Sequence, residues 1–230
     1  VEYSINGMRQ SQVHPEIGYT FATGLRSVLR QDPDIIMVGE IRDKETAQLA
    51  VQAALTGHLM FSTLHTSNAS GALPRLLDLG AETFLLASTM TAVVGQRIVR
   101  KACLECKDSY APPVSVVEDI KVVLGNLLPA SQPASPSQGG RGEPKEGVSK
   151  LYRGKGCPTC NNTGYLGRIG IFEVLLVSEK IARLILEKTD ANTIEDQAKN
   201  EGMVTMKQDG YLKALEGITT IEEVLRVAQE

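Results

Sequence analysis

The sequence has 230 residues, of which 42% are hydrophobic and 22% charged, and its formal net charge is −3. This length suffices for one large core plus a smaller unit, and the charge argues against a nucleic-acid partner, which would require clustered Lys and Arg to neutralise phosphates. The longest apolar stretches fall short of the roughly 20 residues that cross a bilayer, and residues 1–10 lack the basic and apolar regions of an export signal.

The first hundred residues alternate helical and strand patterns. One apolar face predicts a helix over 20–31, and four consecutive apolar residues predict a strand at 35–38 buried on both faces. A helix over 44–57 and a strand over 59–65 follow, then helices near 69–79 and 82–95 and a strand at 96–100. Short connections between alternating helices and strands indicate an α/β fold with a mainly parallel sheet.

The composition changes after residue 101. A helix is predicted within 114–128, and the segment of about 129–147 is rich in Pro, Ser and Gly, which predicts a disordered insertion. A strand over 168–177 precedes a C-terminal helical region with four predicted helices, at 179–188, 192–201, 205–216 and 220–228. We therefore expect three parts, at residues 1–101, 102–167 and 168–230.

Two predicted strands end in polar residues. Glu40 follows the strand at 35–38, and the next strand leads to Thr63, His65, Thr66 and Asn68. Because ligands in open α/β sheets sit at the carboxyl ends of strands, a carboxylate and an imidazole there suit the positioning of a water molecule and the sensing of a phosphate. The alternatives are that Glu40 pairs with Arg42 or starts a helix, and that His58, at a helix-to-strand turn, is purely structural.

The only four cysteines, Cys103, Cys106, Cys157 and Cys160, form two CxxC pairs. This spacing lets both thiolates of each pair bind one tetrahedral Zn²⁺, and four thiolates leave no open position, so the site is expected to be structural. A disulfide is disfavoured in a chain without an export signal, and a thioredoxin-like redox pair lacks its usual context.

Several long stretches resemble the secretion ATPase superfamily, the hexameric motors of type IV pilus assembly and type II secretion. They are the run from Gly24 to Ala69 that contains DIIMVGE and TGHLMFSTLHT, then GQRIVRKAC, GCPTCNNTGYLGRIGIFEVL and DGYLKALEGITTIEEVLRV. The resemblance covers nearly the whole chain apart from residues 107–150, and many assembly ATPases of this superfamily carry a four-cysteine metal site.

The resemblance implies a partial RecA-like P-loop NTPase core that uses ATP and Mg²⁺. DIIMVGE would be the Walker B element, with Glu40 as the acid that activates water, and His58 and His65 would belong to the histidine box. His65 would be the contact that senses hydrolysis. Glu2 would contribute to the magnesium environment. Arg26 and Arg30 would contact phosphate or a neighbouring subunit, although both also fit solvated helix charges.

The phosphate-binding loop GxxxxGK[ST] is absent from the 230 residues, and the superfamily carries it upstream of the segment that begins at Val1. We therefore expect a C-terminal part of a longer motor that, alone, binds ATP poorly and is inactive. The resemblance also implies a homo-hexamer on the cytoplasmic face of the inner membrane, peripheral to the bilayer and driving a membrane-embedded platform protein.

The C-terminal sequence is more similar to the pilus assembly branch than to the type II secretion branch, and both share every catalytic motif. A different class of function stays open: a zinc-ribbon binding module on an α/β scaffold that does not catalyse. That alternative leaves Glu40 and His65 unexplained.

Overall fold

A computed structural model describes residues 4–128 and 150–228. Its contacts divide the chain into two compact units: unit 1 is Val1–Val93 with Leu175–Gly202, and unit 2 is Val94–Val174 with Met203–Glu230. The division into three domains that we expect from the sequence stays a prediction. The predicted insertion at about 129–147 lies outside the described residues. None of the helices in the described ranges is long and apolar enough to cross a membrane.

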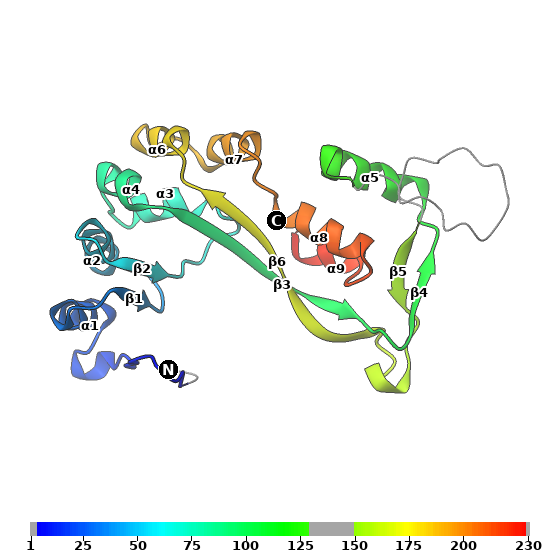
Figure 1. The fold of residues 1–230 in the computed structure, drawn as a ribbon, viewed down its shortest axis with the longest axis horizontal. Coiled ribbons are helices and arrows are strands. Elements are labelled where there is room, and N and C mark those ends of the chain that lie inside the picture. Colours follow the sequence, from blue (N-terminus) through cyan, green and yellow to red (C-terminus); the bar gives the residue numbers. More distant parts are fainter. Residues whose placement is uncertain (1–3, 129–149, 229–230) are drawn as a thin grey trace. The chain divides into compact units, whose positions relative to one another are not determined.

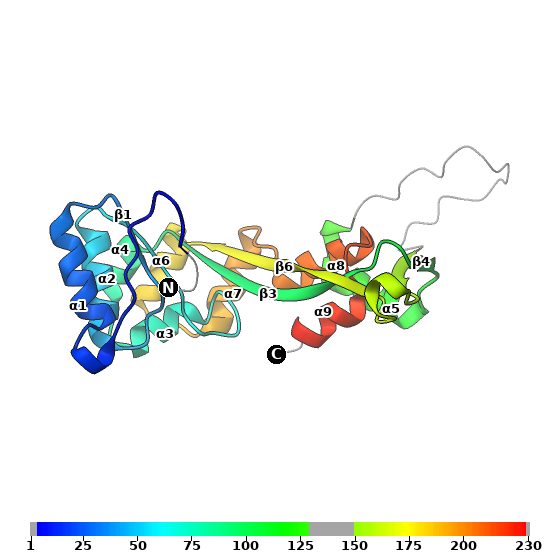
Figure 2. The same cartoon turned by 90° about the horizontal axis from the view of Figure 1, so that it is seen from below.

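Unit 1 contains a parallel pair of strands, β1 (Ile35–Val38) and β2 (Leu59–Ser62). They are joined by α2 (Lys44–Leu55), which begins where the Asp43 side chain accepts a hydrogen bond from the Thr46 N–H. The helix α1 (Phe21–Val28) lies beside α2 in both views (Figure 1, Figure 2). This order confirms the α/β pattern and the parallel pairing that the sequence predicts.

Four further helices complete unit 1, with short 3₁₀ turns at Pro15–Ile17 and Leu29–Gln31. The helices are α3 (Ala72–Asp78), α4 (Thr83–Thr89), α6 (Glu179–Leu186) and α7 (Ala191–Asn200). The α6 helix contacts α4 and α7, so residues 175–202 join the N-terminal part of the chain in one core.

The expectation that the strand at 35–38 is buried on both faces is wrong for this chain. Ile36 and Val38 are buried, whereas Ile35 and Met37 are 61% and 70% exposed. Leu59 lies opposite Ile35 in the register and is also exposed, as is Phe61 opposite Met37. Successive side chains of a strand point to opposite faces, so one face of the β1–β2 pair packs on unit 1 and the other is solvent-exposed and apolar.

Unit 2 contains most of a second sheet, formed by β3 (Ala92–Ala102) and β6 (Tyr165–Leu176). A third sheet pairs β4 (Lys107–Tyr110) with β5 (Leu151–Gly154) in antiparallel fashion, and the sequence predicted neither strand. The helix predicted to reach residue 95 ends at Thr89, because the β-branched residues at 93 and 94 belong to β3 instead.

The helices α5 (Val114–Leu124), α8 (Met206–Leu215) and α9 (Ile221–Ala228) form the core of unit 2 together with β5. The shared core residues are Ile120, Leu124, Leu151, Tyr211, Ala214, Ile221 and Val224. Gly210 permits the close approach of α8 to α9, because a Cβ there would lie 2.5 Å from a methyl group of Val224. The described part of unit 2 also contains two 3₁₀ turns, Gly125–Leu127 and Pro158–Cys160.

Each strand of the β3–β6 sheet has an open edge that α8 and α9 cover with side chains. On β3, the Arg100 N–H donates to Glu223 Oε2 at 3.0 Å, and its carbonyl accepts from Thr219 Oγ1 at 2.8 Å. On β6, the Phe172 N–H donates to Asp209 Oδ2 at 2.8 Å, and the Gly170 carbonyl accepts from Lys213 Nζ at 2.9 Å. These bonds satisfy backbone groups that would otherwise be open to another strand.

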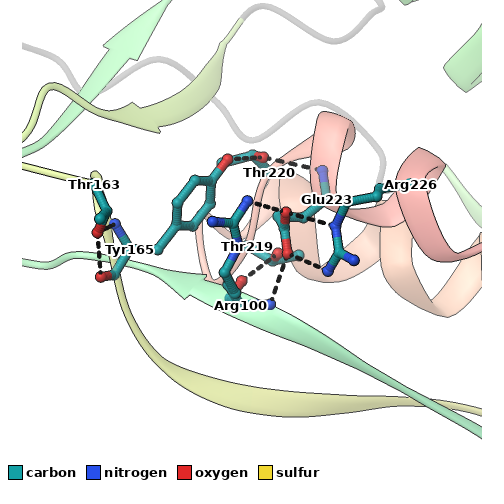
Figure 3. Close-up of polar contacts among 7 residues, drawn as sticks. All are labelled: Arg100, Thr163, Tyr165, Thr219, Thr220, Glu223 and Arg226. Atoms are coloured by element: carbon teal, nitrogen blue, oxygen red, sulfur yellow. Dashed lines mark hydrogen bonds and ion pairs between the residues drawn. The ribbon is translucent and has the colours of Figure 1, made fainter.

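Glu223 is the centre of this arrangement (Figure 3). Its carboxylate is 2% exposed and binds the guanidinium groups of Arg100 at 2.5 Å and Arg226 at 3.0 Å, while Arg100 also stacks over the Tyr165 ring. Burial by itself raises the pKa of Glu223, but the hydrogen bonds from Arg100 and Arg226 outweigh burial and lower the pKa to about 2. The carboxylate is therefore ionised and paired at neutral pH.

We expect Glu223→Gln to reduce the free energy of unfolding at pH 7 by about 3 kcal/mol, because it leaves two arginines without their buried partner. A lowered pKa in the folded state contributes stability above the unfolded pKa that is lost as the pH falls through the folded pKa. The difference in the free energy of unfolding between Glu223→Gln and the wild type should therefore become smaller from about pH 5 toward pH 3. Urea unfolding of both proteins over this range measures it.

The control is Glu216→Gln, which changes an exposed glutamate at the end of α8. It should unfold like the wild type at every pH. A Glu223→Gln protein as stable as this control at pH 7 would show that the carboxylate does not hold α9 to β3.

Candidate functional site

The carboxyl ends of β1 and β2 are joined just beyond their last paired residues. Thr63 Oγ1 donates to the Gly39 carbonyl at 2.6 Å, and the Ile41 N–H donates to the Thr63 carbonyl at 3.0 Å. These bonds extend the parallel register beyond Val38 and Ser62. Glu40 and His65, the residues that the sequence predicts at this edge, are thereby brought into contact.

Glu40 holds two basic side chains at one of its oxygens. Oε2 lies 2.5 Å from Arg42 Nε and 3.2 Å from His65 Nε2, and within the described ranges Oε1 has no hydrogen-bond partner. Desolvation raises the pKa of Glu40, but the hydrogen bonds from Arg42 and His65 bring it below its ordinary value overall. The carboxylate is 22% exposed and ionised at neutral pH, so Oε1 is available to accept a proton or to orient a water molecule.

Glu40 therefore binds Arg42, the structural alternative, and His65, the predicted neighbour at this edge, at the same time. Arg42 sits two residues after Glu40, and the pairing with Arg42 does not displace the one with His65. The imidazole is 79% exposed and Arg42 is 69% exposed. A basic, solvent-accessible rim around a carboxylate is suited to an anionic substrate.

His58 lies at the other end of β2. It precedes Leu59, the first residue of the strand, whereas His65 follows the last one. Its Nδ1 is 3.0 Å from the Ala53 carbonyl and 3.1 Å from Thr56 Oγ1, at the C-terminal end of α2. The structure thus gives His58 a helix-capping contact, which was the structural alternative, and brings only His65 to Glu40.

The two arginines of the sequence prediction lie on the N-terminal helices. Arg26 forms an ion pair with Glu45 at the first turn of α2, and Arg30 is exposed in the 3₁₀ turn Leu29–Gln31. Neither contacts Glu40. Glu2 lies outside the described residues. The roles of these three residues toward nucleotide stay predictions.

Thr66 and Asn68 were expected at the same edge, but their side chains form hydrogen bonds with other residues and not with Glu40 or His65. Thr66 Oγ1 donates to the Asn68 carbonyl at 2.9 Å, and Asn68 Nδ2 donates to Glu195 Oε2 at 2.9 Å. Glu195 is on α7, 127 residues away in the sequence. No local sequence pattern indicates this contact, so sequence reasoning missed it.

The four cysteines form one cluster in unit 2. Cys103 Sγ is 3.8 Å from Cys157 Sγ, Cys106 Sγ is 3.8 Å from Cys160 Sγ, and all four sulfurs lie within 4.8 Å of one another. A disulfide requires about 2.05 Å. A tetrahedron of sulfurs about 2.3 Å from a central Zn²⁺ has edges of about 3.8 Å, so the spacing fits a four-thiolate zinc site.

Backbone N–H groups support the sulfurs. Gly156 donates to Cys106 Sγ at 3.3 Å, and Cys157 and Gly164 donate to Cys160 Sγ at 3.2 and 3.3 Å. Gly164 has φ +77° and its backbone packs directly on Gly154, where a Cβ would lie 2.1 Å from the Gly164 carbonyl oxygen. Only glycines permit this approach, which packs the chain just after the second CxxC pair against the end of β5.

A family model described as "Type II/IV secretion system protein" matches residues 1–226. The chain is 43% identical over 230 residues to "Type II secretion system protein E" of Pseudomonas aeruginosa and covers 41% of that protein. It is 44% identical over 225 residues to "Type IV pilus assembly ATPase PilB" of Thermus thermophilus, where it covers 23%. It therefore spans less than half the length of these curated relatives.

Two solved structures are similar in fold. The pilus retraction motor PilT with bound ADP matches 92% of this chain and 44% of its own at a TM-score of 0.56 and 25% identity. The Legionella pneumophila ATPase DotB matches 92% of this chain and 43% of its own at a TM-score of 0.56 and 22% identity. With a family match over residues 1–226, the chain belongs to the type II/IV secretion system protein family.

Proposed function

We propose that this chain is the C-terminal part of a hexameric motor ATPase that drives type IV pilus assembly. The observation that carries the proposal is the contact of Glu40 with His65 at the carboxyl edge of a parallel strand pair. Relatives that match at least 98% of the chain carry the names "Type II secretion system ATPase E" and "Type IV pilus assembly ATPase PilB", and the solved PilT structure contains bound ADP. The fold supports a catalytic role for this edge, since ligands in α/β sheets bind where strands end.

In this proposal Glu40 is the group that acts on water. Its ionised carboxylate is held through Oε2 by Arg42 and His65, so Oε1 keeps a fixed direction toward the attacking water. Phosphoryl transfer relies on positioning and charge stabilisation, to which Mg²⁺ contributes when it is bound with ATP. His65 connects the γ-phosphate to Glu40, and this link lets it sense hydrolysis.

The other nucleotide contacts are proposed at the margin of this edge. Arg26 and Arg30 are exposed or partly exposed cations suited to phosphate or to a neighbouring subunit. Glu2 is proposed near Mg²⁺. His58 belongs to the histidine box, and its contact with the end of α2 supports a role in setting the start of β2.

The exposed apolar face of β1 and β2 supports a partial RecA-like core. Parallel sheets are covered on both faces, yet Ile35, Met37, Leu59 and Phe61 are all at least half exposed. The chain also lacks GxxxxGK[ST], which cradles phosphates through backbone N–H groups and a lysine. We propose that the rest of the longer protein supplies both the loop and the cover, and that this chain alone binds ATP weakly.

Pilus assembly is favoured over type II secretion by the C-terminal sequence from Ile194 to Leu225. Relatives named for the two machines are equally similar, at 43% and 44% identity. In either machine we place the hexamer on the cytoplasmic face of the inner membrane, where it acts on a membrane-embedded platform protein. Loss of pili or loss of secreted enzymes on gene deletion distinguishes the two. A zinc-ribbon module without catalysis is disfavoured, because it gives the Glu40 contacts no purpose.

The cysteine cluster is proposed to hold one structural Zn²⁺. Cys103, Cys106, Cys157 and Cys160 would all bind as thiolates, and the N–H groups of Gly156, Cys157 and Gly164 would stabilise their charge. The ion would supply folding stability to a zinc subdomain that includes β4, β5 and the two CxxC turns. Four thiolates leave no position for substrate.

In the full-length protein, Glu40→Gln should lower the kcat of ATP hydrolysis by about 10²-fold or more and leave the KM for ATP near the wild-type value. The amide keeps the shape of the side chain but cannot accept a proton. Steady-state phosphate release measures both constants.

The matched control is Glu82→Gln, which changes an exposed glutamate at the start of α4 in the same unit. Its kcat should equal that of the wild type. If Glu40→Gln hydrolyses ATP as fast as this control, Glu40 is not the activating acid.

Purified protein should contain one zinc per chain by elemental analysis. Cys157→Ser and Cys160→Ser should each lower this content and the melting temperature, because a structural zinc site contributes folding energy directly. Removal of the metal with a chelator should reproduce the loss of stability in the wild type. A zinc-free, fully folded wild type with four reactive thiols would contradict the metal site.

A further inference from the structure

His65 lies in a short segment, residues 64–66, whose position is set by the contacts at its two ends. His65 is 79% exposed, and among the described residues its imidazole has one polar contact, with Glu40 Oε2 at 3.2 Å. A side chain that exposed cannot be held by packing. Its direction toward Glu40 therefore depends on where the backbone of Leu64, His65 and Thr66 is held.

One end of the segment is tied to the sheet. Thr63 donates to the Gly39 carbonyl and accepts the Ile41 N–H, so the start of the segment moves with β1. These bonds belong to the strand pair itself. They fix the position where the segment leaves β2 and not the direction it takes afterward.

The other end is held by the amide of Asn68. Asn68 Oδ1 accepts the Gly71 N–H at 3.0 Å, at the start of α3, and Nδ2 donates to Glu195 Oε2 at 2.9 Å. Gly71 leaves room for this amide, since a Cβ there would lie 3.0 Å from Asn68 Oδ1. The amide oxygen of Asn68 therefore binds the start of α3, and its amide nitrogen binds α7.

Glu195 is itself fixed. Its side chain is 23% exposed and pairs with Lys199, one turn later on α7, at 2.5 Å. The neighbouring residues Ile194 and Ala198 are buried, so this part of α7 packs in the core of unit 1. Asn68 is thus bound to a rigid helix and not to another loop.

We propose that Asn68 and Glu195 are positioning residues for the reaction at Glu40. Their hydrogen bond holds the second end of the His65 segment, so that α7, from the C-terminal half of the chain, sets the contact between His65 and Glu40. The proposal rests on the proposed ATPase function. Neither residue touches the reacting atoms.

The test uses the full-length protein and an exchange of partners. Asn68→Asp keeps an acceptor for the Gly71 N–H but sets two carboxylates against each other, and the double variant Asn68→Asp with Glu195→Gln restores a donor and an acceptor. We expect kcat to fall about 10-fold in Asn68→Asp, because a small displacement of a group that positions the reactants lowers the rate of the chemical step. The KM for ATP should not change. The double variant should recover to within about 3-fold of the wild type.

Hydrogen–deuterium exchange supplies a readout that does not require catalysis. Backbone amides of residues 63–71 should exchange faster in Asn68→Asp than in the wild type and return to wild-type protection in the double variant. Asp196→Asn is the control: it is 75% exposed, adjacent to Glu195 on α7 and should change neither exchange nor kcat.

Three results overturn the proposal: unchanged exchange in Asn68→Asp, faster exchange with unchanged kcat, or a double variant as slow as the single one. Unchanged hydrolysis in Glu40→Gln would instead remove the proposed function, while the exchange data would still decide whether the Asn68 to Glu195 bond holds the segment. The two failures are therefore distinguishable.

Discussion

Parallel pairing of β1 with β2 is the constraint on which the candidate site depends. The register that sets Ile35 opposite Leu59 carries both strands to a common end, where Glu40 and His65 meet. A shift of one residue would turn Ile36 and Val38 out of the core and move every following side chain to the other face. The buried residues of a four-residue strand therefore fix the position of a carboxylate that lies beyond the strand and is 22% exposed.

A different kind of constraint governs unit 2. A sheet of two strands has two open edges. Asp209 and Lys213 of α8 satisfy one edge, and Glu223 of α9 with Thr219, just before α9, satisfies the other. The arrangement requires a carboxylate buried to 2% exposure, which is tolerated because two arginines and a backbone N–H neutralise and bind it. The same chain thus uses one glutamate to hold a helix and, in unit 1, another that is partly exposed at the end of a strand pair.

The sequence was most informative where a short pattern of residues is typical of one structure. Four apolar residues followed by Glu40 predicted a strand and an edge, and four cysteines in two CxxC pairs predicted a cluster that the structure confirms. It was less informative where a residue has several partners within reach. A histidine after a helix fitted both a structural and a nucleotide-binding role, and the structure shows that His58 binds the end of α2. The sequence around Asn68 did not indicate that Glu195 would bind it.

Two further differences have the same origin in tertiary contacts. Glu223 is one of two adjacent acids in the first turn of α9, and only the folded chain shows that it is buried and bound to Arg100 of β3. The strands β4 and β5 pair across a long separation in sequence, and neither is apolar enough to be predicted from its own residues. Local patterns therefore predicted the α/β order, the contact of Glu40 with His65 and the cysteine cluster. The contacts of Asn68 and Glu223 came only from the folded chain.

We propose that the edge formed by Glu40 and His65 faces the γ-phosphate in the full-length protein. A cryo-EM structure of that protein with Mg²⁺ and a non-hydrolysable ATP analogue tests this placement. We expect a γ-phosphate separated from Glu40 Oε1 by a single water molecule, with His65 in hydrogen-bond contact with the phosphate. A γ-phosphate at the amino ends of β1 and β2, or one with no water bridge to Glu40, would contradict it.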